Sequence, residues 1–310
     1  MKTKGIKTKR NKIFKKDQLE MMLLALPAVL VILVMRYIPM AGVMIAFKNY
    51  KYNLGILGSE WVGFDNFVFF FKSNDAALVI RNALAYNTVF IITGNMIAIT
   101  MAILLTYLGK KAVGFIQNAM FQPYILSWVV VAFVSLVFLS YKNGVFNSVA
   151  VSLGGEKISW YGEPKYWPFI LWFFHMWKGL GYQVLIYYTT IINIDTDILD
   201  AAKVDGCNAV QTAYKIIVPI IKPTVTVLVI LAIGGIFNSD FGLFYQIPQA
   251  SGALKKVTDV VETYTYRTLT VAGNAGVSAA VGFAQGVVGM ILVLMTNAIT
   301  KRYDKENALF

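Results

Sequence analysis

Long apolar runs, separated by short polar segments, dominate the chain. Six of these runs carry almost no charge, with only Arg36 and Lys178 inside them. They occupy residues 21–47, 82–109, 112–141, 166–194, 223–239 and 268–300. Because a helix needs about 20 predominantly apolar residues to cross a bilayer, the pattern predicts an all-α integral membrane protein with six transmembrane helices.

The composition supports this class. Of the 310 residues, 57% are hydrophobic and only 14% are charged, whereas about a quarter of the residues in a soluble domain are charged. The net charge is +12, and eight of the first 16 residues are lysine or arginine. A basic run directly before an apolar segment is typical of a cytoplasmic flank, and no nucleic-acid-binding motif accompanies it. We therefore expect residues 1–18 to form a basic cytoplasmic tail and residues 19–310 to form one transmembrane domain, with the C-terminus also cytoplasmic.

The sequence offers little for catalysis or metal binding. One cysteine, Cys207, cannot form an internal disulfide, and one histidine, His175, is too few for a metal site. We expect His175 to be a packed helix residue. Nothing resembles the phosphate-binding loop GxxxxGK[ST], so the chain does not bind ATP through a loop of this kind. We predict no catalytic residue, no metal site and no cofactor in this chain.

The polar segment DAAKVDGCNAVQTAYKIIVPIIKP, residues 200–223, separates two of the apolar runs. We expect a short helix that starts near Asp200, whose charge suits a helix N-terminus, and ends at Gly206, because a glycine in the left-handed conformation commonly closes a helix. A second helix should follow and be stopped by Pro219. Two rigid helices joined at a glycine, on the cytoplasmic side, could transmit a movement to the membrane helices at either end of the segment.

This segment resembles the EAA motif of the permease subunits of binding-protein-dependent ABC importers, whose pattern is E-A-A-x3-G-x9-I-x-L-P. Two positions differ conservatively, because Asp200 stands for glutamate and Val218 for leucine. The resemblance implies that the loop 195–223, between the fourth and fifth spans, couples the chain to a cytoplasmic ATPase. The residues expected to serve this coupling are Asp200, Ala201, Ala202, Asp205, Gly206, Ile216 and Pro219.

The resemblance extends over nearly the whole chain. Segments such as RYIPMAGVMIAFKNY, WVGFDNF, QPYILSWVVVAF and AVGFAQGVVGMILVLMTN are similar to sugar permeases of the maltose-permease-like group, in particular its LplB- and YteP-type oligosaccharide permeases. The resemblance implies a type I importer fold in the bacterial cytoplasmic membrane, surrounded by lipid. It also implies a heterodimer with a second homologous permease, two copies of a cytoplasmic ATPase that carries ATP and magnesium, and an extracytoplasmic binding protein that delivers an oligosaccharide.

Polar and aromatic residues inside the fourth, fifth and sixth runs are candidates for the substrate pathway, because polar groups at membrane depth usually face protein or a water-filled cavity. For Trp177 and Tyr182, packing inside the protein and anchoring at the membrane interface are open alternatives. Lys178 could face the cavity, pair with an acid of the second permease, or extend to the membrane interface. Gly282 and Gly286 lie one turn apart, which favours close helix packing. The candidate pathway residues are Trp177, Tyr182, Phe237, Asn238, Asp240 and Gln285.

Two other classes of function fit less well. A secondary transporter driven by an ion gradient commonly shows internal repeats and intramembrane acids. Here no repeat is visible, and Asp240 is the only acid that we expect near the interior of a span. An intramembrane enzyme would need a paired catalytic constellation, which the sequence does not show. The sequence does not name the sugar or the ATPase.

Overall fold

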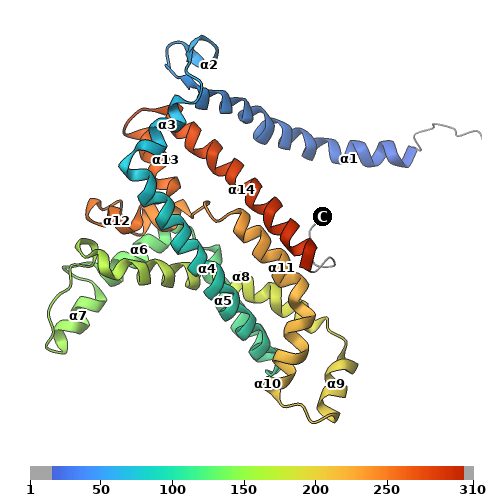
Figure 1. Ribbon diagram of the computed structural model, residues 1–310. Coiled ribbons are helices and arrows are strands. Elements are labelled where there is room, and N and C mark those ends of the chain that lie inside the picture. Colours follow the sequence, from blue (N-terminus) through green and yellow to red (C-terminus); the bar gives the residue numbers. More distant parts are fainter. Residues whose placement is uncertain (1–15, 304–310) are drawn as a thin grey trace, which may run out of the picture.

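The computed structural model describes residues 16–303, which are mostly helical (Figure 1). The basic tail predicted for residues 1–18 therefore lies mostly outside the described residues. The strands of the described chain are β1 (Lys48–Asn49) and β2 (Glu60–Trp61), which pair antiparallel. The shorter helical elements are α2 (Gly55–Gly58), α3 (Asp65–Lys72), α7 (Val145–Ser152), η3 (Trp160–Gly162), η4 (Pro164–Tyr166), α9 (Thr196–Val204), α10 (Ala209–Thr212), η5 (Ala213–Ile217), η6 (Gly242–Gln246), η7 (Gly252–Leu254), α12 (Lys255–Thr258) and α13 (Val261–Thr270).

Four helices of the described chain are long and apolar enough to cross a membrane. The first combines α1 (Lys16–Ile32), η1 (Leu33–Tyr37) and η2 (Ile38–Phe47), and the others are α4 (Asn74–Thr106), the run from α10 through α11 (Val218–Gly234), and α14 (Ala275–Tyr303). A further helix, α8 (Trp167–Ile192), is 26 residues long but is not among these four; its sequence includes His175, Lys178 and Gln183. The chain thus crosses a membrane several times, as predicted.

The third predicted span is not one straight helix. It consists of α5 (Lys110–Ile125) and α6 (Trp128–Leu139), which are bent by 100° relative to each other. Leu126 and Ser127 have extended backbone between the two helices, and the Ser127 side chain accepts a hydrogen bond from the Val130 amide. A serine N-cap therefore starts a new helix, and the described chain has five apolar spans when this bent pair is counted as one.

The long helices pack around three clusters of buried apolar side chains. Helix α8 packs against both α4 and α5, and α11 packs against α14. His175 packs as expected, with its ring stacked on Phe90 at a centroid distance of 3.9 Å. By contrast, the apolar window of the first spanning helix is not buried at all, and Figure 1 shows α1 projecting away from the other helices.

Close helix packing occurs at different glycines from those predicted. A Cβ added at Gly282 or Gly286 would meet nothing within 4 Å, so these two do not bring helices of this chain together. A Cβ at Gly289 would lie 2.6 Å from the Gly234 carbonyl oxygen, and one at Gly234 would lie 2.1 Å from Val293. The glycines that allow α11 and α14 to approach are therefore Gly234 and Gly289.

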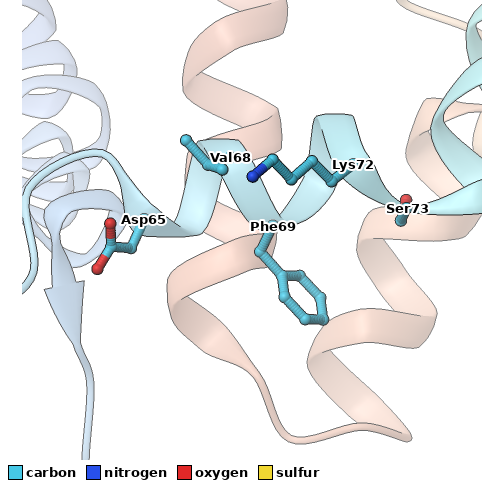
Figure 2. Close-up of a pocket in the computed structure, with 5 residues that line it drawn as sticks. All are labelled: Asp65, Val68, Phe69, Lys72 and Ser73. Carbon is cyan, nitrogen blue, oxygen red and sulfur yellow. The ribbon is translucent and has the colours of Figure 1, made fainter.

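A hollow of about 440 Å³ lies along α3 and is lined by Asp65, Val68, Phe69, Lys72 and Ser73. Figure 2 shows four of these side chains spread along α3 and Ser73 just beyond its end, and they do not converge on a common point. None of the residues predicted to couple or to line a pathway belongs to this hollow.

Candidate functional site

The first candidate site is the short helix α9 and its junction with the next helix. Gly206 has a φ of +77°, its amide donates to the Lys203 carbonyl, and the Cys207 amide donates to the Ala202 carbonyl at 2.9 Å. These bonds form a Schellman motif, which confirms that a left-handed glycine ends the helix. The expected start is wrong, because α9 begins at Thr196 with Asp195 as its N-cap. Asp200 therefore lies in the middle of the helix, where it pairs with Lys203 at 2.8 Å.

The second helix of this segment is continuous with a membrane span. Asn208 and Gln211 form a reciprocal capping box at the start of α10, and the helix continues to Gly234. The prediction that Pro219 stops the helix is wrong. A wider, π-helical turn, η5, precedes it, and the Val218 amide donates to Ala213 five residues back. In a regular α-helix, the ring of a proline clashes with the carbonyl four residues before it. The wide turn relieves this clash, and so the helix continues through Pro219.

Most of the predicted coupling residues lie on the surface of this segment. Ala202 is buried, and Ile216 is half-buried. The exposed members of the predicted set are Asp200, Ala201, Asp205, Gly206 and Pro219. Three apolar side chains near the junction are also strongly exposed, Val204 at 88%, Tyr214 at 74% and Val210 at 65%. The sequence interpretation did not name these three, although an apolar residue in a polar loop was the available signal. Large apolar groups left exposed in this way commonly mark a protein–protein contact.

The second candidate site brings together three segments that are far apart in the sequence. On α8, the Tyr182 ring stacks on Tyr124 at a centroid distance of 5.0 Å. The Lys178 ammonium lies 5.2 Å from the Trp128 ring centroid, and the Trp128 indole donates to Asp240 Oδ2 at 2.6 Å. Trp128 therefore joins the predicted residues on α8 to the predicted Asp240. We call Tyr124, Trp128, Lys178, Tyr182 and Asp240 the aromatic–charged cluster.

A polar network adjoins this cluster where the chain turns between α11 and η6. The Gln285 amide of α14 donates to Asn238 Oδ1, to the Phe237 carbonyl at 2.8 Å and to Glu262 Oε1 at 2.7 Å. Glu262 Oε1 also accepts from the Ser239 amide at 2.9 Å. The structure thus brings the predicted Asn238 and Gln285 together.

Glu262 is a partly buried acid of this network that the sequence interpretation did not name. Its Oε2 is buried and has no hydrogen-bond partner among the described residues. Glu262 lies in α13, outside the candidate spans. Burial raises the pKa of its carboxyl and nearby Asp240 adds to the rise, whereas the accepted hydrogen bonds oppose it.

Two of the predicted pathway residues are not part of either group. Trp177 lines an apolar hollow of about 500 Å³ with phenylalanines from α6, α7 and α8, including Phe138, Phe146 and Phe173. The Phe237 side chain packs against a buried apolar cluster around Phe70. Both side chains therefore have apolar surroundings, and only the Phe237 carbonyl reaches the polar network.

A family model described as "Binding-protein-dependent transport system inner membrane component" matches residues 94–305. The protein LplB of Bacillus subtilis is 33% identical over 285 residues, which are 92% of this chain and 89% of the relative. The polygalacturonan/rhamnogalacturonan transport system permease protein YteP of the same organism is 32% identical over 306 residues, which are 97% of this chain and 94% of the relative.

Solved structures show the same architecture. One is a bacterial alginate ABC transporter in complex with an alginate pentasaccharide-bound periplasmic protein, and one of its chains matches with a TM-score of 0.83 and 26% identity, over 94% of this chain and 96% of the other. Another is a bacterial ABC transporter involved in the import of the acidic polysaccharide alginate, with a TM-score of 0.84, 26% identity and coverage of 93% and 97%. The chain therefore belongs to the family of binding-protein-dependent transport system inner membrane components, and it is a permease subunit of an ABC transporter rather than an enzyme.

Proposed function

We propose that this permease is half of the translocation pathway of an ATP-driven importer that carries an oligosaccharide across the bacterial cytoplasmic membrane. The relatives named for polygalacturonan/rhamnogalacturonan and for alginate support an oligosaccharide derived from a polysaccharide. On this proposal, a second homologous permease forms the other half, and an extracytoplasmic binding protein delivers the sugar. Two copies of a cytoplasmic ATPase bind ATP and magnesium.

The topology that we propose has six membrane crossings. The four apolar spans, the bent α5–α6 pair and α8 would provide them, with both termini in the cytoplasm. Figure 1 supports this arrangement, because the α4–α5 connection and the α9–α10 region lie at one end of the molecule, whereas α3 and α13 lie at the other. The Tyr107 hydroxyl also donates to the Ala209 carbonyl at 3.4 Å, which joins these two connections. Residues 1–18 and 19–310 would be the tail and the permease domain.

The observation that carries the proposal is that one helix connects the two candidate sites. The run from Ala209 to Gly234 begins beside α9, and the chain that follows its far end carries Asn238 and Asp240. Only residues 205–208 separate α9 from this helix. A movement of α9 by the ATPase would therefore shift the rigid helix and, with it, the polar turn at the other end. Such a shift is what alternating access requires of a coupling element.

The exposed apolar side chains of the α9 junction would supply the contact with the ATPase. Val204 is 88% exposed and its burial against a partner would be favourable, whereas an aspartate there would have to be desolvated. In the assembled transporter, Val204→Asp should reduce co-purification of the ATPase and abolish ATP-dependent uptake. Val271→Asp is the matched control, because Val271 is 82% exposed and follows α13, away from α9. Equal ATPase recovery and uptake in the two variants would contradict the proposal.

A further inference from the structure

The ammonium of Lys178 has no carboxylate partner in the part of the chain that the structure describes. It is the only charged residue of α8, whose 26 residues are otherwise uncharged. A charge at this depth is costly unless it has a partner or lines a polar pathway. The nearby acid, Asp240, is already engaged, because it accepts from the Trp128 indole at 2.6 Å and from the Gly242 amide at 2.9 Å.

The surroundings of Lys178 hold the ammonium in place without neutralising it. Its Nζ donates to the Tyr124 carbonyl at 2.8 Å. That carbonyl lies in the last turn of α5, where carbonyls lack intrahelical partners and the helix dipole favours a cation. Two of the three ammonium hydrogens therefore remain available, and two hydrogens can meet the two oxygens of a carboxylate.

Aromatic faces surround this ammonium. Lys178 Nζ lies 5.5 Å from the Tyr124 ring centroid and 5.2 Å from that of Trp128. One turn along α8, Tyr182 stacks on Tyr124, and each of these two tyrosines is 44% exposed. An aromatic face of this kind can pack against the apolar face of a sugar ring, while the ammonium reaches a substituent at the edge of the ring.

We propose that Lys178 recognises the carboxylate of a uronate residue in the transported oligosaccharide, and that Tyr182 and Tyr124 pack against the sugar ring of that uronate. The inference rests on the proposed function and specifies the class of sugar: an acidic oligosaccharide rather than a neutral one. It also assigns Lys178 to the pathway, in preference to an ion pair with the second permease or an extension to the membrane interface.

The test uses the complete transporter in proteoliposomes, with its binding protein, and two probes that share one sugar backbone and differ at the carboxyl groups. Trigalacturonate carries carboxylates, and fully methyl-esterified trigalacturonate has the same backbone without them. Lys178→Gln keeps a hydrogen-bond donor but loses the charge, Lys178→Met keeps the volume, and Lys178→Arg keeps the charge. The binding protein is the same in every preparation, so its own preference cancels when variants are compared.

We expect Lys178→Gln and Lys178→Met to lower the ratio of trigalacturonate uptake to ester uptake by about 10- to 100-fold, the range for one hydrogen bond to a charged group. Lys178→Arg should keep most of the ratio. If the neutral variants lower uptake of both probes equally, or fail to assemble, the ammonium is structural or pairs with an acid of the second permease, and the inference is overturned.

The wild-type transporter separates this inference from the proposed function. ATP-dependent uptake of either probe supports the proposed function, and an unchanged ratio in the variants then overturns the inference alone. If the wild type transports only the ester, the acidic class is wrong. If the wild type transports neither probe and the binding protein does not stimulate its ATPase, the proposed function fails and the inference fails with it.

Discussion

Gly242→Ala should disrupt the aromatic–charged cluster, because the added methyl group would collide with Trp128. A Cβ at position 242 would lie 2.2 Å from Trp128 Cδ1, 2.3 Å from Cγ and 2.6 Å from Cβ. These separations are far below a van der Waals contact. Since the Trp128 Cβ is fixed to the backbone of α6, rotation of the indole alone cannot remove the clash. Either Trp128 leaves its position or η6 moves away from α6.

The expected magnitude follows from two losses. Overpacking of this kind costs about 1–3 kcal/mol, and loss of the hydrogen bond from Trp128 to Asp240 costs about 1.5–3 kcal/mol because the acceptor is charged. The two losses share Trp128, so they should not add fully, and a net destabilisation of about 2–4 kcal/mol follows from these ranges. The Lys178 ammonium would also lose the ring that lies 5.2 Å from it.

The assay measures thermal unfolding and oligosaccharide uptake of the assembled transporter. Gly242→Ala should lower the Tm by several degrees and reduce uptake at least tenfold, which corresponds to about 1.4 kcal/mol. Gly286→Ala is the matched control, because a Cβ there meets nothing within 4 Å. If Gly242→Ala has the Tm and the uptake of the wild type, Trp128 does not hold the cluster together as described.

Three further predictions concern the coupling junction and the polar network. Gly206→Val should uncouple ATP hydrolysis from uptake, since the φ of +77° is costly for a β-branched residue; normal uptake and normal ATP hydrolysis in the purified variant would show that the Schellman turn is dispensable. Glu262→Gln should flatten the dependence of Tm on pH. The raised pKa of Glu262 means that the folded protein holds this proton more tightly than the unfolded chain, so stability should fall as pH rises from the ordinary range of a glutamate through the raised pKa; equal Tm profiles between pH 5 and 8.5 would contradict this. Asn238→Ala removes the acceptor that Gln285 contacts and should reduce uptake about 5- to 100-fold, which corresponds to 1–3 kcal/mol; uptake kinetics like those of the wild type would exclude Asn238 from the pathway.

Features set by local sequence were predictable. The left-handed turn at Gly206 depends only on the glycine itself and on the helix that precedes it. The position of the glycine in the loop sequence was therefore enough to predict the turn. The break between α5 and α6 is also local, because it lies at the Ser127 cap. It was nevertheless not predicted: residues 112–141 form one uncharged run, and hydropathy measures the length and apolarity of such a run but not its direction.

Features set by distant contacts were not predictable in this way. Trp128 and Asp240 are 112 positions apart, and only the packing of η6 on α6 brings them together. Glu262 lies between two apolar runs, in a segment that reads as a polar loop, and its burial depends on Gln285 of α14. The continuous helix past Pro219 depends on a π-helical turn, for which the sequence shows no evident signal.

The energy source of uptake tests the central claim most directly, because the alternative that the sequence left open is an ion-driven transporter. The measurement is sugar uptake by proteoliposomes that contain the chain with its second permease and ATPase, with the binding protein added outside and ATP enclosed. We predict that vanadate stops uptake, whereas a proton uncoupler leaves it intact. Uptake that persists in vanadate but collapses with the uncoupler would contradict the account.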